Sequence, residues 1–287
     1  MAIELVCYKQ IPVWDESALP EHLVTRHNTQ AGTWGGIKVL KGRLKFHELN
    51  DNGEVVSEEE LTPESDEKIV HPQEWHKVAA ASDDMQMQFS CYCEKADYFH
   101  KRYGMTTTHS DVVAAAEVVK PCKVLDLGCG QGRNALYLSL LDFDVTAVDQ
   151  NPGAVQALGD VASQEHLPVR TGVYDINRAD LPENFDFIVA TVVFMFLQPD
   201  RVPEILADIQ AKTNPGGYNL IVSAMDTADF PCPMPFSFKF KEGELRDYYR
   251  DWEMVEYSEE LGAMHATDEL GNPIQFKFVN MLARKPL

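Results

Sequence analysis

The segment VLDLGCGQGRN at residues 124–134 constrains the fold more than any other part of the sequence. A hydrophobic run that leads into closely spaced glycines predicts a β-strand, a tight turn and the start of a helix. Glycine lets the backbone approach a ligand closely, and the helix start offers unpaired N–H groups. Asp126 ends this strand, and Asp149 closes the next one, about 20 residues further on, where a carboxylate can bind a ribose diol.

Two adenosine-containing cofactors compete for such a turn. The dinucleotide fingerprint requires a third glycine at the position of Arg133, and Asp126 would repel a pyrophosphate. S-adenosylmethionine has no phosphate, and its sulfonium and ammonium groups favour a nearby carboxylate. The pattern resembles the first motif of class I S-adenosylmethionine-dependent methyltransferases. This resemblance implies a Rossmann-like α/β fold and S-adenosylmethionine as the cofactor.

Charge and composition restrict the partners. The sequence has 45 Asp and Glu against 25 Lys and Arg, a net charge of −20, and no basic run. Such a chain is expected to bind neither nucleic acid nor a membrane surface. No stretch reaches the length of a membrane-spanning helix, and the start lacks a signal peptide. Scattered cysteines favour a cytoplasmic protein, and whether it forms a homo-oligomer stays open.

Residues 1–94 are predicted to form a small all-β domain. Residues 37–40 and 43–47 are expected to pair as a hairpin, and residues 85–93 alternate with period two. The stretches TWGGIKVLKG at 33–42 and PQEWH at 72–76 resemble a cupin-like domain. Metal-binding cupins carry an H-x-H pair that is missing here. We therefore predict a binding module without a metal, and a site built from distant histidines is the less favoured alternative.

Residues 95–287 are predicted to form the methyltransferase domain. Helical and strand patterns alternate, which favours a doubly wound sheet with ligands at the carboxyl ends of its strands. Asn151 and Asp200 are expected to cap helices, and residues 214–217 to form a turn. The expected strands are 123–127, 144–149, 167–172, 185–191, 218–222, 252–258 and 276–284, and the expected helices are 111–119, 132–141, 152–164 and 201–212.

The glycine turn supplies the first part of the predicted cofactor site. Gly128 and Gly130 are expected to contact the amino-acid part of the cofactor through their backbones. Arg133, in the first helical turn, is placed to pair with the carboxylate of the cofactor, and Asn134 is assigned to the same site. Asp149 is expected to accept hydrogen bonds from both ribose hydroxyls.

Later strand ends supply the second part. Asp175 is expected to bind the adenine amino group, with Ile176 packed on the ring, and Thr191 to lie beside the methyl donor. The segment TVVFMF at 191–196 contains no acid or amide to hold an exocyclic amine. Together with the acidic charge, this disfavours methylation of nucleobases.

Segments in the second domain are similar to the tellurite-resistance methyltransferases of the TehB family. They occur in the family's order at residues 98–110, 191–197, 215–222, 224–229, 241–246 and 281–285, and longer members carry a cupin-like extension. The resemblance implies methyl transfer to tellurite or selenite, with Tyr98 and Tyr103 at the cofactor and His265 and Arg246 at the substrate.

Shorter family members have arginines where this chain has Ala266 and Pro273, so Arg246 or Arg102 would have to replace them. A chalcogen lone pair is a soft nucleophile that needs positioning more than a strong base. Residues 231–240, with Phe236, are expected to form a lid. A methyltransferase for a small organic nucleophile such as a thiol, or a non-catalytic scaffold that binds the cofactor, are the alternatives.

Overall fold

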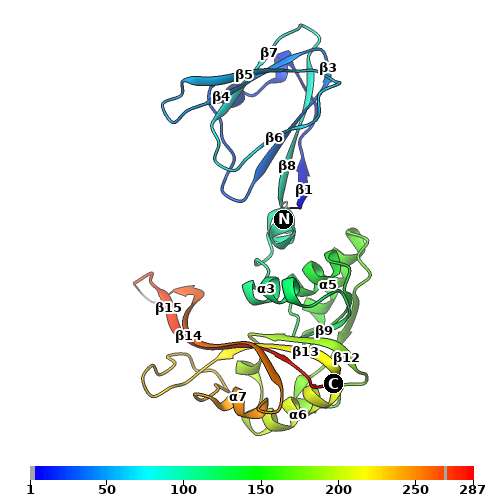
Figure 1. The fold of residues 1–287 in the computed structure, drawn as a ribbon, viewed down its shortest axis with the longest axis vertical. Helices are drawn as coiled ribbons and strands as arrows, with labels where there is room; N and C mark the ends of the chain where they lie inside the picture. The colour runs from blue at the N-terminus through cyan, green and yellow to red at the C-terminus, as the bar shows by residue number, and fades with distance from the viewer. Residues whose placement is uncertain (1–3, 268–269) are drawn as a thin grey trace. The chain divides into compact units, whose positions relative to one another are not determined.

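The computed structural model describes residues 4–267 and 270–287, with the side chains of residues 264–266 outside the description. The chain divides into two compact units, Met1–Met105 and Thr106–Leu287 (Figure 1). The division lies beyond the boundary expected at residue 94, because α2 (Tyr98–Tyr103) contacts strands of the first unit. No helix among the described residues is long and apolar enough to cross a membrane.

The first unit consists of antiparallel strands in two sheets. One sheet has the order β1-β8-β3-β6, with β2 beside β8, and the other has the order β5-β4-β7. Buried side chains between them, such as Ile37, Phe46 and Met87, form one core. The elements are β1 (Leu5–Gln10), β2 (Trp14–Asp15), η1 (Glu16–Ala18), α1 (Glu21–Thr25), β3 (Trp34–Lys41), β4 (Leu44–Leu49), β5 (Val55–Leu61), β6 (Lys68–Val70), β7 (His76–Ala80), β8 (Gln86–Glu94), η2 (Lys95–Asp97) and α2.

The hairpin expected at residues 37–47 is wrong. Strand β3 pairs with β6 and β8, whereas β4 pairs with β5 and β7, so the chain passes from one sheet to the other at Gly42. This glycine has φ +68°, and a Cβ there would lie 2.4 Å from the Ser82 hydroxyl oxygen. Both strands turn apolar residues toward the shared core, so their alternation alone could not show that they belong to different sheets.

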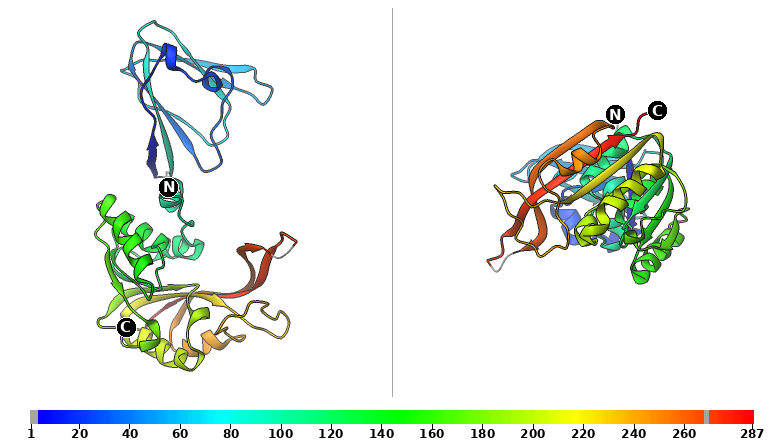
Figure 2. Two further views of the ribbon diagram at one scale, coloured as in Figure 1. Left: turned by 180° about the vertical axis from the view of Figure 1, so that it is seen from behind. Right: turned by 90° about the horizontal axis from the view of Figure 1, so that it is seen from below.

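The second unit is built around a mixed sheet with the order β11-β10-β9-β12-β13-β15-β14. The strands from β11 to β13 run parallel, and β15 is antiparallel to both β13 and β14. Helices α3 and α5 lie on one face and α6 and α7 on the other (Figures 1 and 2). The strand order reverses at β9, which is where open α/β sheets bind their ligands.

The elements of this unit follow the predicted alternation closely. They are α3 (Ser110–Val118), β9 (Lys123–Leu127), α4 (Arg133–Leu140), β10 (Asp144–Asp149), α5 (Pro152–Gln164), β11 (Arg170–Val173), η3 (Ile176–Arg178), β12 (Phe185–Thr191), η4 (Phe194–Phe196), η5 (Pro199–Arg201), α6 (Val202–Lys212), β13 (Thr213–Ala224), α7 (Glu244–Tyr248), β14 (Glu253–Thr267) and β15 (Pro273–Arg284).

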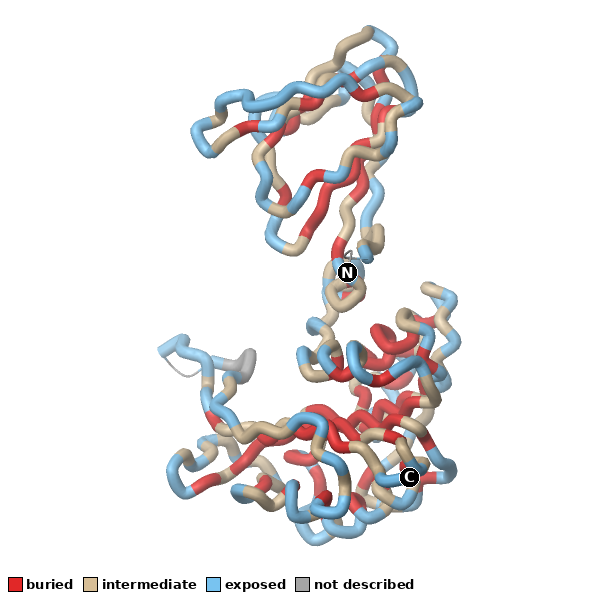
Figure 3. The backbone as a smooth tube through the Cα atoms, viewed as in Figure 1, coloured by how far each residue is buried: buried red, intermediate tan, exposed pale blue. Residues whose placement is uncertain are grey.

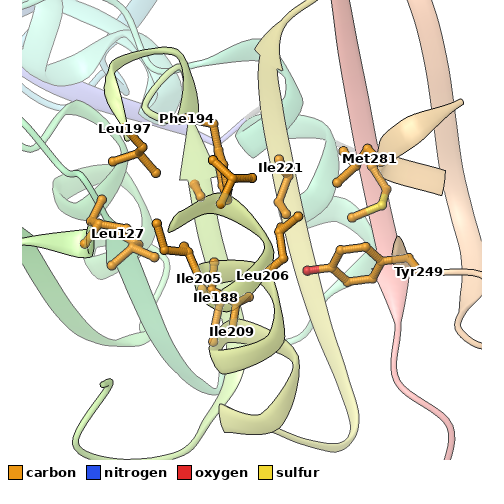
Figure 4. Packing of buried hydrophobic residues seen from close by; sticks show 14 of the residues in the cluster. Leu127, Ile188, Phe194, Leu197, Ile205, Leu206, Ile209, Ile221, Tyr249 and Met281 are labelled. Carbon is orange, nitrogen blue, oxygen red and sulfur yellow. The ribbon is translucent and has the colours of Figure 1, made fainter. Parts of the chain in front are cut away.

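The central strands and α6 share the core of this unit. Leu127, Ile188 and Ile221 pack against side chains of α6, including Ile205 and Leu206 (Figure 4). Burial concentrates along these strands (Figure 3). An apolar run buried on both faces is what a central parallel strand requires, which explains why the prediction of β12 is confirmed at both ends.

The predicted caps and turn have mixed outcomes. The Asn151 side chain accepts hydrogen bonds from the N–H groups of Gly153 and Ala154, so that cap is confirmed. The Asp200 cap is wrong, because a short 3₁₀ turn absorbs Asp200 and α6 begins after Arg201 without a side-chain cap. The predicted turn at 214–217 lies inside β13. The pairing of β13 with β12 is irregular there, because the register shifts between Phe185 and Phe187 of β12.

Candidate functional site

The glycine turn lies at the carboxyl end of β9, beside the point where the strand order reverses. Gly128 has φ +81°, and a Cβ there would lie 2.4 Å from a methyl carbon of Val193. Gly130 has φ +53°, and a Cβ there would meet no described atom within 4 Å. Gly128 therefore allows close packing against the segment after β12. The backbone at Gly130 faces open space that a ligand can enter.

Asp149 ends the neighbouring strand β10. Its Oδ2 accepts a hydrogen bond from the Gly130 N–H (2.9 Å), and its Oδ1 accepts one from the Asn151 N–H (2.8 Å). The carboxylate is half-buried and thus connects the two turns while keeping one side accessible. The structure brings Gly128, Gly130 and Asp149 together as the sequence predicts for a cofactor site.

Asp126 lies in β9, just before the turn. It is 1% exposed, and its Oδ2 has no hydrogen-bond partner among the described residues. Burial raises the pKa of this carboxyl to about 7, although the nearby Ala135 N–H and Arg133 charge act in the opposite direction. A buried carboxylate oxygen without a partner suits a cationic ligand, which would stabilise the ionised form.

The third strand end contributes Asp175 and Ile176, which follow β11. Asp175 is exposed, and its Oδ1 accepts hydrogen bonds from the backbone N–H (3.0 Å) and side-chain amide (2.9 Å) of Asn177. Ile176 is buried, and its Cδ1 would lie 3.4 Å from a Cβ at Gly128. Ile176 therefore reaches the glycine turn, and Asp175 lies next to it in the chain with one face open to solvent.

Asn134 and Thr191 form a buried connection near the same edge of the sheet. The Asn134 Nδ2 donates to the Thr191 hydroxyl (2.9 Å), and its Oδ1 accepts from the His109 N–H (3.0 Å). Both side chains are largely buried, at 4% and 6% exposure. The amide of Asn134 thus links the starts of α3 and α4 to the end of β12, and its contact with a cofactor stays a prediction.

A cavity of about 510 Å³ opens beside these residues. Its described lining comes from the starts of α3 and α4, the segment after β12, and strands β13, β14 and β15. Apolar side chains dominate it, and the polar groups are His109, Ser110, Asp111, Arg133, Glu260 and Asn280. The Arg133 Nη1 donates to the carbonyl of Thr107 (3.3 Å).

Sequence reasoning missed the contribution of α3 to this cavity. Burial, and then the positive charge of Arg133, lower the pKa of His109 to about 4, so the ring is neutral near pH 7. Its Nδ1 lies 3.3 Å from the backbone nitrogen of Asp111 and 3.3 Å from the Oδ2 of the same residue. Burial and the nearby Glu256 raise the pKa of Asp111. The segment 108–110 carried a family resemblance, but no local pattern indicated that it faces the site.

The predicted substrate residues have different positions. Arg246 lies on α7 with its guanidinium 4.1 Å from the centre of the Tyr257 ring, and it is not among the described residues that line the cavity. His265 belongs to β14, but its side chain lies outside the described part of the chain. Tyr98, Arg102 and Tyr103 lie on α2 in the first unit, where the ring centre of Phe99 lies 5.0 Å from that of Tyr98 and 6.3 Å from that of Tyr103.

The expected lid segment packs over the aromatic wall of the cavity. Phe236 is half-buried, and its ring centre lies 5.7 Å from those of Phe196 and Phe276, with edge-to-face geometry in both pairs. The ring centre of Phe276 in turn lies 4.4 Å from that of Phe278. Among the described residues, no group of three or more His, Cys, Asp or Glu side chains is arranged to hold a metal ion.

Comparison with known proteins assigns the chain to a family. Residues 91–282 match the family model described as "Tellurite resistance protein TehB", and residues 9–89 match the "TehB-like domain". The chain belongs to the TehB family. The resemblance predicted from the sequence is therefore confirmed, including the extension before the methyltransferase domain.

Two similar proteins and one solved structure support the same arrangement. A "Probable S-adenosyl-L-methionine-dependent methyltransferase TehB" of Haemophilus influenzae (strain 10810) is 56% identical over 285 residues, covering 99% of this chain and 100% of the relative. "Hemagglutinin 1" of Eikenella corrodens is 61% identical over 239 residues, which cover 83% of this chain and 80% of that protein. The crystal structure of TehB from Haemophilus influenzae superposes with a TM-score of 0.95 at 56% identity. The match covers 99% of this chain and 100% of that structure's chain. The class I methyltransferase fold is confirmed.

Proposed function

We propose that this TehB-family chain is an S-adenosylmethionine-dependent methyltransferase that acts on tellurite- or selenite-type chalcogen substrates. The observation that carries the proposal is the cavity that opens beside the glycine turn and shares Arg133 with the predicted cofactor site. A donor held at the turn would lie next to an acceptor held in the cavity. Methyl transfer requires this adjacency, because rate depends on bringing donor and acceptor into line.

The residues at the turn fit the proposed cofactor. When bound there, S-adenosylmethionine supplies a methyl group attached to a cationic sulfur. Asp149 would bind the ribose hydroxyls, the backbone at Gly130 would admit the ligand, and the unpartnered Oδ2 of Asp126 would favour its positive charge. Arg133 would pair with the cofactor carboxylate at the start of α4, where the helix dipole also favours an anion.

The acceptor side of the cavity suits a soft nucleophile. Its wall contains Met195, Phe196 and Phe276, and the segment after β12 offers Val192 rather than an acid or amide. Such a wall positions a polarisable atom through packing, and a chalcogen lone pair needs no strong general base. The proposed role is protection against toxic chalcogen oxyanions. We assign it to the cytoplasm, because the free thiols of the cysteines fit a reducing compartment.

The test measures S-adenosylhomocysteine from the purified chain with S-adenosylmethionine and selenite or tellurite, in buffer that contains glutathione. We expect release that depends on the chalcogen and methylated tellurium or selenium in the mass spectrum. The Asp149→Ala variant should lose both, whereas Asp160→Asn, an exposed carboxylate on α5, should retain them. Cofactor binding without any methylated chalcogen product would contradict the proposed function.

A further inference from the structure

One face of β15, together with Val222 of β13, forms the floor of the cavity. Residues 276, 278 and 280 point to the same side of β15, because side chains alternate along a strand, and all three line the cavity. Two of them are phenylalanines, and the third is Asn280. Strands favour aromatic and β-branched residues, and an apolar surface offers an amide no hydrogen bonds. The asparagine is therefore the exception on this floor.

The side chain of Asn280 is half-buried in this position. Its Oδ1 is buried and has no hydrogen-bond partner among the described residues. A buried amide oxygen without a donor lowers the stability of a fold, so the packing of the sheet gives no reason for an asparagine here. A ligand in the cavity that completes the hydrogen bonds of the amide does give one.

The pairing of the strands places Asn280 near the predicted methyl donor. Thr191 of β12 pairs with Val222 of β13, and Val222 pairs with Asn280 of β15. Paired side chains point to the same face of a sheet, and Val222 and Asn280 both line the cavity. Neighbouring strands lie about 4.8 Å apart, so Asn280 lies about 10 Å from Thr191 along this row. The row leaves room for a methyl donor and an acceptor of a few atoms.

The other polar groups of the cavity are committed elsewhere or cannot donate. Arg133 is the only permanent cation among the described lining residues, it donates to a backbone carbonyl, and it is placed to pair with the cofactor carboxylate. Asp111 and Glu260 cannot donate a hydrogen bond when they are ionised. The start of α3 lies on the cofactor side, because the Asn134 amide links it to α4 and to the end of β12. An acceptor that lies on the floor therefore has the Asn280 amide as its polar contact.

We infer that the Asn280 amide binds the chalcogen oxyanion through its non-reacting oxygen atoms and holds the chalcogen toward the methyl donor. The inference rests on the proposed function and names a substrate-binding residue of that site. Near neutral pH, selenite and tellurite each carry one proton, so they present a hydroxyl donor as well as oxygen acceptors. An amide offers the matching pair, since Nδ2 donates to an oxygen and Oδ1 accepts from the hydroxyl.

The first test measures the binding of selenite to the full-length chain by isothermal titration calorimetry, with the protein saturated with S-adenosylhomocysteine and the buffer free of thiols. Asn280→Leu has a similar volume but forms no side-chain hydrogen bonds, so its Kd for selenite should rise roughly tenfold. Its affinity for S-adenosylhomocysteine should stay unaltered. Its melting temperature should not fall, because the change removes a buried oxygen that lacks a partner in the described structure.

Asn184→Leu is the matched control, since Asn184 is exposed and is not among the described residues that line the cavity. It should bind selenite like the wild type. An equal Kd for selenite in the wild type and in a folded Asn280→Leu protein would overturn the inference, and so would a wild-type chain that binds no selenite.

The second test separates hydrogen bonding to an anion from the shape of the side chain. Asn280→Asp keeps the shape but replaces the Nδ2 donor with a second oxygen, so it should weaken selenite binding at least as much as Asn280→Leu does. A purely structural role predicts the opposite order, with Asn280→Asp close to the wild type. If Asn280→Leu does not fold, Asn280→Asp decides alone, and wild-type selenite binding by this folded variant would overturn the inference.

Failure of the proposed function gives a different result. A wild-type chain that binds selenite through Asn280, yet yields no methylated chalcogen with S-adenosylmethionine, would contradict the methyl transfer and support the binding role of Asn280. A wild-type chain that yields methylated product, with selenite binding unaltered in both folded Asn280 variants, would overturn the inference alone.

Discussion

Two carboxylates at neighbouring strand ends have different properties because their surroundings differ. Asp149 is half-buried and accepts two backbone hydrogen bonds, from the N–H groups of Gly130 and Asn151. Asp126 is almost completely buried and keeps one oxygen without a partner among the described residues. The sequence predicted both acids at the site from their spacing. It could not predict the degree of burial, because that depends on how α4 packs over β9.

The raised pKa of Asp126 predicts a stability that depends on pH. The folded value of about 7 exceeds the unfolded value of about 4, so between these limits the folded state keeps a proton that the unfolded state has lost. The free energy of unfolding should therefore fall as pH rises through this window. At about 1.4 kcal/mol per pKa unit, the cofactor-free protein should lose a few kcal/mol relative to Asp126→Asn.

Urea unfolding of both proteins from pH 4 to pH 8 measures this difference. Comparing slopes removes the constant cost of the asparagine amide itself. The two curves of unfolding free energy should diverge as pH rises, because the wild type loses stability relative to Asp126→Asn. Parallel curves would show that Asp126 is not the titrating group.

The buried amide of Asn134 predicts a second effect on stability. Asn134→Ala would leave the His109 N–H and the Thr191 hydroxyl without their partner. Each buried polar group left unpaired costs about 1–3 kcal/mol, so we expect a loss of roughly 2–5 kcal/mol in the free energy of unfolding. Asn184→Ala is the matched control, since its exposed amide bonds only to Asn214 among the described residues. Similar losses in both variants would refute the structural role of Asn134.

At the scale of elements, prediction succeeded where local chemistry decided the outcome. The boundaries of β9, β10, α5 and β12 follow from apolar runs, an asparagine cap and a proline at the first helical turn. Prediction failed where the outcome depends on which distant strand a segment pairs with. The chain at Gly42 turns a corner between sheets instead of closing a hairpin, and the residues after α6 continue as β13 because β12 lies beside them.

The segment between β13 and α7 is the element whose motion we expect to affect turnover. Phe236 connects this segment to the cavity wall through Phe196 and Phe276. Phe236→Ala should lower kcat by roughly tenfold, because a looser lid positions the acceptor less well. Cofactor affinity should change little, since the glycine turn does not contact this side chain directly.

Hydrogen exchange separates this effect from a general loss of stability. Amides of residues 226–240 should exchange faster in Phe236→Ala, while those of β9 and β10 should keep their protection. Phe236→Leu retains much of the apolar volume and should recover part of the turnover. If kcat stayed at the wild-type value while the segment exchanged faster, the segment would have no gating role.

At the scale of the whole molecule, the predicted cofactor residues are divided between the two compact units. Gly128, Gly130 and Asp149 lie in the second unit, and the family resemblance adds Tyr98 and Tyr103, which lie on α2 in the first. No local pattern predicts this division, because α2 joins the first unit through tertiary contacts with β1 and β8.

Binding of S-adenosylmethionine to shortened and substituted chains tests whether α2 contributes to the cofactor site. The chain of residues 106–287 keeps the glycine turn and Asp149, so we expect it to fold, as judged by circular dichroism, and to bind the cofactor weakly. The family resemblance assigns Tyr103 to the cofactor, and on that basis Tyr103→Ala in the full chain should weaken binding roughly tenfold, which corresponds to about 1.4 kcal/mol. Tyr103 is half-buried on α2 and its ring centre lies 6.3 Å from that of Phe99, so the melting temperature of the variant must report whether it folds. If Tyr103→Ala binds like the wild type but the shortened chain binds weakly, the first unit acts through other residues. If both bind like the wild type, α2 plays no part in the cofactor site.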